Sequence, residues 1–129
     1  MFRQTQPGGP PPQTLLLGVG ADPQQAALAR AEGADLIDVR GATPGALAAI
    51  RASLPAGVLW TGPRADPLDA DKLAAAATPA AVIATAAVCT WLGAPVVRSR
   101  HTRAVRRAID MTASIAGHRP PSHAVRGLA

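Results

Sequence analysis

Hydrophobic residues fall into short runs, separated by longer stretches in which apolar positions recur at helical spacing. The runs at 14–19, 36–39, 58–61, 81–84 and 95–97 are typical of strands that are buried on both faces. The stretches between them carry alanine and leucine three and four residues apart, as amphipathic helices do. The pattern therefore predicts alternating strands and helices, with helices that begin near residues 23, 44, 67, 86 and 102.

Proline beside a capping residue marks the start of three of these helices. Asp-Pro at 22–23 and Thr-Pro at 43–44 each place an N-cap before a proline at the first helical position. Gln25 is placed to complete a capping box in the first of them. Asp-Pro at 66–67 predicts a third helix, with Leu73 pointing inward and Thr-Pro at 78–79 closing it.

The order of these elements predicts the class of fold. Five strand–helix units of this kind favour a mostly parallel sheet with right-handed crossovers. We expect one domain over residues 14–117. Residues 1–13 are rich in proline, glycine and glutamine and predict a disordered lead-in, and residues 118–129 form a basic tail.

The excess of positive charge lies at the carboxyl end of the chain. The net charge is +5, and residues 98–129 hold seven arginines against the single acid Asp110. Such a segment could meet the phosphates of a metabolite, a nucleic acid or an anionic membrane. It contains no aromatic side chain on which a base could stack, so nucleic acid is the less favoured partner.

Other classes of site find little support in the sequence. Cys89 lies in an apolar run and reads as a buried structural thiol. His118 and His123 lack the spacing of a metal site, so we expect none. There is no nucleophile elbow, P-loop or complete dinucleotide fingerprint. With neither a membrane-spanning run nor a secretory signal, the expected location is the cytoplasm.

The strand-to-helix junction after residue 97 is the strongest candidate for a binding site. Arg98, Arg100, His101 and Arg103 gather where a parallel sheet ends and the last helix begins. Free N–H groups and the helix dipole attract anions at such a corner. Arg98 and Arg100 are two apart and so could share a face. The cluster is equally well read as a solvated basic face.

Asp38 is the best candidate for a buried acid, because it stands inside an apolar strand. An unpaired carboxylate is costly there. It either serves a ligand at the end of the sheet or accepts a hydrogen bond from the adjacent loop.

Two stretches resemble dihydropteroate synthase, the pterin-binding (β/α)8 barrel of folate synthesis. The first, EGADLIDVRGATPGA at 32–46, is similar to the family's second strand and loop, EGADIIDVGGESTRPGA, with two residues deleted. The second, 85–111, resembles the family's last units, and Gly93, Ala94, Val96, Val97 and Arg98 match its GA-x-[IV]-[VL]-R pattern. Together they cover about a third of the chain.

The resemblance implies a partial barrel, (β/α)5, with three units missing from the middle. A half-barrel alone would expose its apolar strand face, so we expect association with a second copy or with a full-length relative. The alternative is an open flavodoxin-like sheet with helices on both faces.

The resemblance also implies which residues would bind a phosphorylated ligand. Asp38, Thr43 and Arg98 stand at matching positions, Arg100 replaces a histidine, and His101 falls on an aspartate position. The expected ligand is a pterin diphosphate or another phosphorylated small molecule. Mg²⁺ is expected only as the counter-ion of a diphosphate ligand, and no other cofactor is expected.

Departures from the family argue against full activity. Trp60 stands where the family has a pterin-binding aspartate, the chain has no asparagine, and Lys72 is its only lysine. If active, the protein would join p-aminobenzoate to dihydropterin diphosphate. The favoured expectation is a reduced homologue with weak or no catalysis, and the alternative is a basic interaction module acting through residues 98–126.

Overall fold

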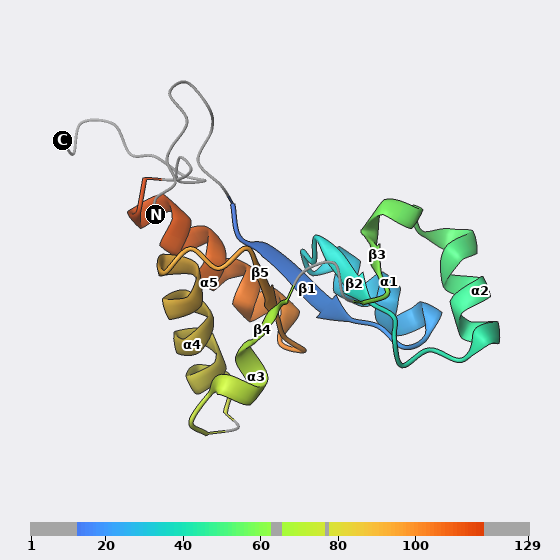
Figure 1. Cartoon of the computed structure of the whole chain (residues 1–129), viewed down its shortest axis with the longest axis horizontal. Helices are drawn as coiled ribbons and strands as arrows, with labels where there is room; N and C mark the ends of the chain where they lie inside the picture. Colours follow the sequence, from blue (N-terminus) through green and yellow to red (C-terminus); the bar gives the residue numbers. More distant parts are fainter. Residues whose placement is uncertain (1–12, 63–65, 77, 118–129) are drawn as a thin grey trace.

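A computed structural model describes residues 13–62, 66–76 and 78–117, which form a parallel sheet with helices packed along it (Figure 1). Nearly all of the predicted lead-in, together with the basic tail and its two histidines, lies outside the described residues. Within them, no helix combines the length and apolar character needed to cross a membrane.

The described chain contains five strands, five α-helices and one short 3-10 turn. In order along the chain these are β1 (Leu15–Val19), α1 (Pro23–Ala31), β2 (Leu36–Asp38), α2 (Pro44–Ser53), η1 (Ala56–Val58), β3 (Leu59–Trp60), β4 (Leu68–Asp69), α3 (Ala70–Leu73), α4 (Pro79–Trp91), β5 (Val96–Arg98) and α5 (Thr102–Ile115).

The predicted starts of α1 and α2 are confirmed. The side chains of Asp22 and Thr43 accept from the backbone N–H groups of Gln25 and Ala46, at 2.8 and 3.1 Å. Each satisfies one of the free N–H groups of a first helical turn. The side chain of Gln25 accepts in return from the N–H of Ala21, one residue earlier than in a standard capping box.

The strand predicted at 81–84 is wrong, because residues 79–91 form the single helix α4. The helix predicted at 86–92 is confirmed as the last part of α4, but α4 begins earlier, at Pro79. The apolar run Val82-Ile83 is typical of a strand, but alanines surround it and favour a helix. Thr78, expected to close a helix, is the N-cap of α4 and accepts from the N–H of Ala81 at 3.2 Å. Pro79 then takes the first helical position.

The helix predicted to begin at 66–67 is also wrong. Leu68 and Asp69 form strand β4, which pairs with β5, and the helix that follows is a single turn. Asp69 is the N-cap of that turn rather than part of it. Leu73 is 56% exposed, against the expectation that it points inward.

The strands lie in the order β3-β2-β1-β5-β4, and every pair is parallel. This differs from the flavodoxin-like order 2-1-3-4-5. The steps from β1 to β2, from β2 to β3 and from β4 to β5 all run the same way along the sheet. Right-handed crossovers in one direction place their helices on one face, so the two-sided arrangement is not found.

The core divides along the two faces of the sheet. On the helix side, Leu16 and Val97 pack with α4 and α5, and Ile37 packs with α1 and α2. On the opposite side, Leu17, Val96 and Trp60 form a third cluster with exposures of 0%, 5% and 8%. These strand side chains are buried within one chain, so the exposed apolar strand face expected of a half-barrel is not found.

Candidate functional site

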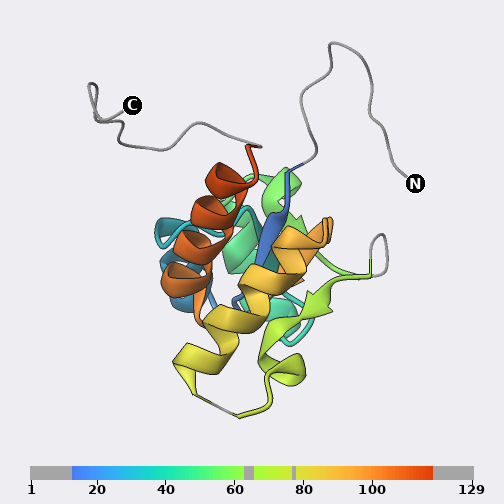
Figure 2. The ribbon, with the colours of Figure 1, turned by 90° about the vertical axis from the view of Figure 1, so that its left-hand side faces the viewer.

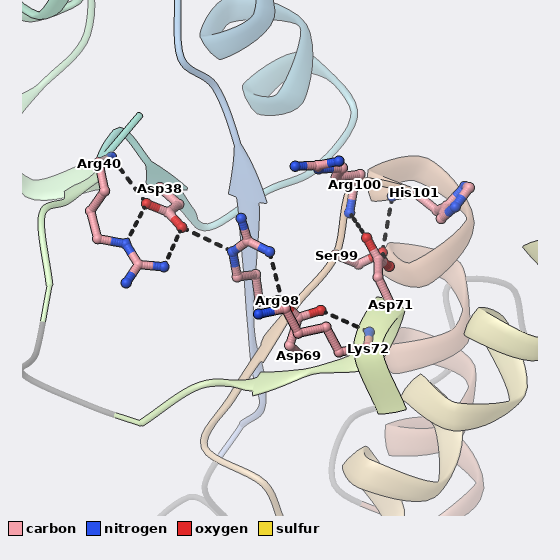
Figure 3. A network of polar contacts seen from close by, with 9 residues as sticks. All are labelled: Asp38, Arg40, Asp69, Asp71, Lys72, Arg98, Ser99, Arg100 and His101. Carbon is pink, nitrogen blue, oxygen red and sulfur yellow. Dashed lines mark hydrogen bonds and ion pairs between the residues drawn. The ribbon is translucent and has the colours of Figure 1, made fainter. Parts of the chain in front are cut away.

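Asp38 ends β2 at the carboxyl edge of the sheet, and its side chain is only 3% exposed. Its carboxylate accepts hydrogen bonds from Arg40 and Arg98 (Figure 3). Arg40 donates through its backbone N–H, Nε and Nη2 at 3.1, 3.0 and 2.9 Å, and Arg98 donates through Nε at 2.9 Å. The loop bond expected for this acid is therefore present, together with a second bond that joins β2 to β5.

These bonds determine the charge on Asp38. Burial by itself would raise the pKa of the carboxyl, but the hydrogen bonds from the Arg40 side chain and backbone and from Arg98 outweigh it. The pKa therefore lies below the ordinary value for aspartate. Asp38 is ionised at neutral pH and holds both guanidinium groups in place.

Arg98 ties together three strands. Its Nε donates to Asp38 on β2, and its Nη1 donates to Asp69 Oδ2 on β4 at 2.8 Å. Asp69 also caps α3 by accepting from the N–H of Lys72 at 3.1 Å. Since β5 lies between β1 and β4, one guanidinium spans the middle of the carboxyl edge. A side chain committed to two acids is poorly placed to serve as the main ligand of a third anion.

Arg40 lies over the ring of Trp60, beside Asp38. Its guanidinium lies 4.4 Å from the centroid of the Trp60 ring, an arrangement in which the cation faces the aromatic ring. Trp60 pairs with Asp38 across the β2–β3 ladder and is 8% exposed. Side chains therefore fill the region beside Asp38.

A second group of bonds shapes the loop between β5 and α5. Asp71, on α3, accepts from Ser99 Oγ at 2.7 Å and from the N–H of Arg100 at 2.9 Å. Ser99 is fully buried, and its Oγ accepts in turn from the N–H of His101 at 2.9 Å. These contacts hold the backbone of the loop while the side chain of Arg100 extends outward (Figure 3).

All five residues predicted from the sequence lie at or after the ends of β2 and β5, on the carboxyl edge of the sheet. Asp38 and Arg98 are hydrogen-bonded, and Arg100 and His101 come just after Ser99, the residue that follows Arg98. Unlike Arg98, the exposed Arg100 guanidinium makes no hydrogen bond or ion pair within the described residues. Thr43 is exposed at the start of α2, where its hydroxyl oxygen serves as the helix cap.

Four important residues were not singled out as site residues from the sequence: Arg40, Asp69, Asp71 and Ser99. The spacing of Asp69 and Asp71 was a usable signal, because the two acids contact Arg98 at the end of β5 and the loop that follows it. The prediction of a helix across this stretch hid it. Arg40 lies inside the stretch 32–46 but departs from the family pattern, which has glycine at this position.

Much of the basic segment is paired with acids. Arg106 contacts Asp35 and Asp110 at 2.8 and 2.9 Å, and Arg103 lies 3.8 Å from Glu32. Arg100 and Arg107 are exposed. The expectation of a continuous solvated basic face thus applies to fewer residues than the sequence suggests.

A pocket of about 540 Å³ lies at the opposite, amino edge of the sheet. Its lining includes Thr14, Asp35, Arg106 and Asp110. The ion pair between Arg106 and Asp35 joins α5 to the start of β2, and Arg106 also pairs with Asp110 within α5. It includes none of the residues predicted to bind a ligand.

The metal-binding side chains do not gather in the described part of the chain, where no group of three or more His, Cys, Asp or Glu could hold an ion. Cys89 is 7% exposed, as expected for a structural thiol, and burial raises its pKa.

Comparison of the chain with protein-family models, with curated proteins and with solved structures finds no match in any of the three.

Proposed function

We propose that this chain is a shortened relative of the dihydropteroate synthase barrel that binds a phosphorylated pterin-type ligand at the carboxyl edge of its sheet without catalysing the synthase reaction. The proposal joins the resemblance of residues 32–46 and 85–111 to the geometry of the site.

The position of β5 is the observation that carries this proposal. In a closed barrel the last strand pairs with the first, and here β5 pairs with β1 while β4 lies beyond it at the edge. Removal of the middle units of a barrel would leave this order. Helices on one face of the sheet agree with the same origin.

The two stretches that carry the resemblance also meet in space. Asp38 belongs to the first and Arg98 to the second, and they share a hydrogen bond of 2.9 Å. Thr43 and Arg100 follow the ends of β2 and β5. Because parallel strands end at one edge of a sheet, all four residues lie on the side where an α/β protein binds its ligands.

The phosphate end of a ligand would bind next to Arg98. Arg100 is exposed and uncommitted among the described residues, and His101 precedes the free N–H groups of α5. An arginine fork matches the oxygens of a phosphate. We therefore propose that Arg100, rather than Arg98, makes the main contact with the phosphate.

The ring end of a pterin finds fewer partners. Trp60 and Arg40 occupy the space beside Asp38, and the carboxylate already accepts four hydrogen bonds. A heterocycle of this kind is held by amides and acids with free hydrogen-bonding capacity. These are the reasons for proposing binding without turnover.

Calorimetric titration tests the proposal. Dihydropterin diphosphate, with and without Mg²⁺, should bind with one-to-one stoichiometry, and Arg100→Ala should weaken binding roughly tenfold, the loss of one charge-assisted contact. Arg107→Ala removes another exposed arginine and should leave affinity unchanged. Absence of saturable binding, or equal losses in both variants, would contradict the proposal.

Two further measurements separate the alternatives. Incubation with p-aminobenzoate should yield no dihydropteroate, and steady formation of product would show that catalysis survives. Binding to an unrelated oligonucleotide that collapses when the salt concentration is raised would instead favour the basic interaction module.

A further inference from the structure

Helix α4 is uncharged throughout, and its outer side is not covered. Its sequence, PAAVIATAAVCTW, contains no acidic or basic residue. A helix that is apolar all round is normally buried on all sides. In Figure 2, α4 crosses the front of the molecule, and no other described segment lies before it.

Large exposed apolar side chains gather on α4 and its neighbour α5. Nine such residues occur in the described chain, and five of them belong to this helix pair. They are Val88 (58% exposed), Trp91 (59%), Leu92 (77%), Met111 (66%) and Ile115 (72%). Large exposed apolar side chains concentrated on two packed helices are typical of an interaction site.

The side chains on the outer side of α4 increase in size along the helix. Ala80, Ala84, Val88 and Trp91 are all exposed, and their spacing places them in one stripe. The stripe begins with two small side chains and ends with two large ones. A helix of the same sequence laid antiparallel on it would set Trp91 against Ala80, and Val88 against Ala84.

We propose that this stripe of α4 is the contact by which two copies of the chain form a two-fold symmetric dimer, with the two α4 helices antiparallel. A two-fold interface must be complementary to itself, and a stripe that is small at one end and large at the other meets that condition. Met111 and Ile115, four residues apart, are exposed on α5, the helix that packs against α4.

Charge and area favour a second copy over a different partner. A stripe without charge offers nothing to an acidic or basic partner, whereas a second copy brings an equally apolar surface. The exposed fractions of the five residues add up to about three fully exposed large side chains, so they supply a substantial part of the ~800 Å² that one partner contributes to a standard interface. This dimer is independent of the ligand proposed above.

Sedimentation equilibrium and light scattering on the full chain test the dimer. The wild type should be dimeric at micromolar concentration, and Val88→Glu should weaken association roughly 100-fold or more, because it places a charge in an apolar contact. Leu28→Glu is the matched control, since Leu28 is 57% exposed on α1, and it should remain dimeric. A monomeric wild type, or equal effects of both variants, would overturn the proposal.

The variant Ala84→Trp distinguishes the antiparallel packing from non-specific hydrophobic association. The variant adds apolar surface, so a non-specific apolar patch would self-associate more strongly. In the antiparallel contact the new ring would collide with Val88 of the second copy, and association should fall at least about tenfold. Tighter association of Ala84→Trp would refute the antiparallel packing, and circular dichroism of each variant checks that the fold is retained.

Discussion

Arg98 Nε donates to Asp38 Oδ2 at 2.9 Å across 60 residues of sequence, and thereby joins the last strand of the sheet to the second. The same guanidinium reaches Asp69 on β4, so one arginine links strands from both halves of the chain. The partners are buried or nearly so, with side-chain exposures of 16% for Arg98 and 3% for Asp38. An ion pair in such a place matters most when one partner is removed.

Removal of Arg98 should therefore destabilise the fold. We expect Arg98→Ala to lower the free energy of unfolding by about 2–4 kcal/mol, because Asp38 then keeps only Arg40 as a hydrogen-bond partner and Asp69 loses the guanidinium that forms its ion pair. The stability of Arg98→Lys should lie between those of the wild type and Arg98→Ala, since lysine retains the charge but cannot donate to both acids as a guanidinium does. Arg100→Ala, at an exposed position, should change stability by less than about 0.5 kcal/mol. Urea denaturation measures all three, and equal stability of Arg98→Ala and wild type would show that the bridging bonds are not needed.

Asp38 should make stability depend on pH in the acid range. Its pKa is lowered in the folded state, so its contribution is complete above the pKa of the unfolded chain, about 4, and is lost as the pH falls through the folded value. Asp38→Asn removes this contribution. The stability difference between wild type and Asp38→Asn should be largest near pH 6 and shrink below pH 4, and a difference that stays constant down to pH 2 would contradict the assignment.

Gly20 should tolerate no larger side chain. A Cβ at this position would lie 2.6 Å from the Cα of Ala26, which is backbone at the start of α1 and cannot turn aside. We expect Gly20→Ala to cost about 1–3 kcal/mol. Gly45 is the matched control, because nothing lies within 4 Å of its Cβ position in α2. Gly45→Ala should stabilise the protein by about 0.5–1 kcal/mol, and thermal denaturation compares the two variants.

The cap of α4 tests whether residues 79–91 are helical. Thr78→Ala removes the hydrogen bond to the N–H of Ala81 and should lower stability by about 1 kcal/mol, with Thr78→Ser near wild type. Thr85 lies within the helix and bonds back to the carbonyl of Ala81 at 2.8 Å, so Thr85→Ala should be nearly neutral. If both threonines had the same effect in thermal denaturation, Thr78 would not be a cap.

Local patterns were sufficient where neighbouring residues decide the structure. The caps Asp22 and Thr43, the stop at Gly33 with φ of +110°, and the helix from Thr102 all follow from interactions within a few residues. The burial of Asp38 also followed from its place inside an apolar strand. These features are local, so the sequence alone determined them.

Long-range pairing decided the rest. Val82 and Ile83 by themselves are typical of a strand, and the alanines around them, together with the packing of α4 against α5 and the sheet, select the helix. Leu68 and Asp69 form a strand because β5 offers them a partner, and Asp69 then meets an arginine 29 residues away. No local signal predicts which strand ends lie side by side, and the ion pairs between their side chains depend on that arrangement. Only the tertiary structure therefore shows that Arg98 pairs with two acids and that the Arg100 guanidinium pairs with none among the described residues.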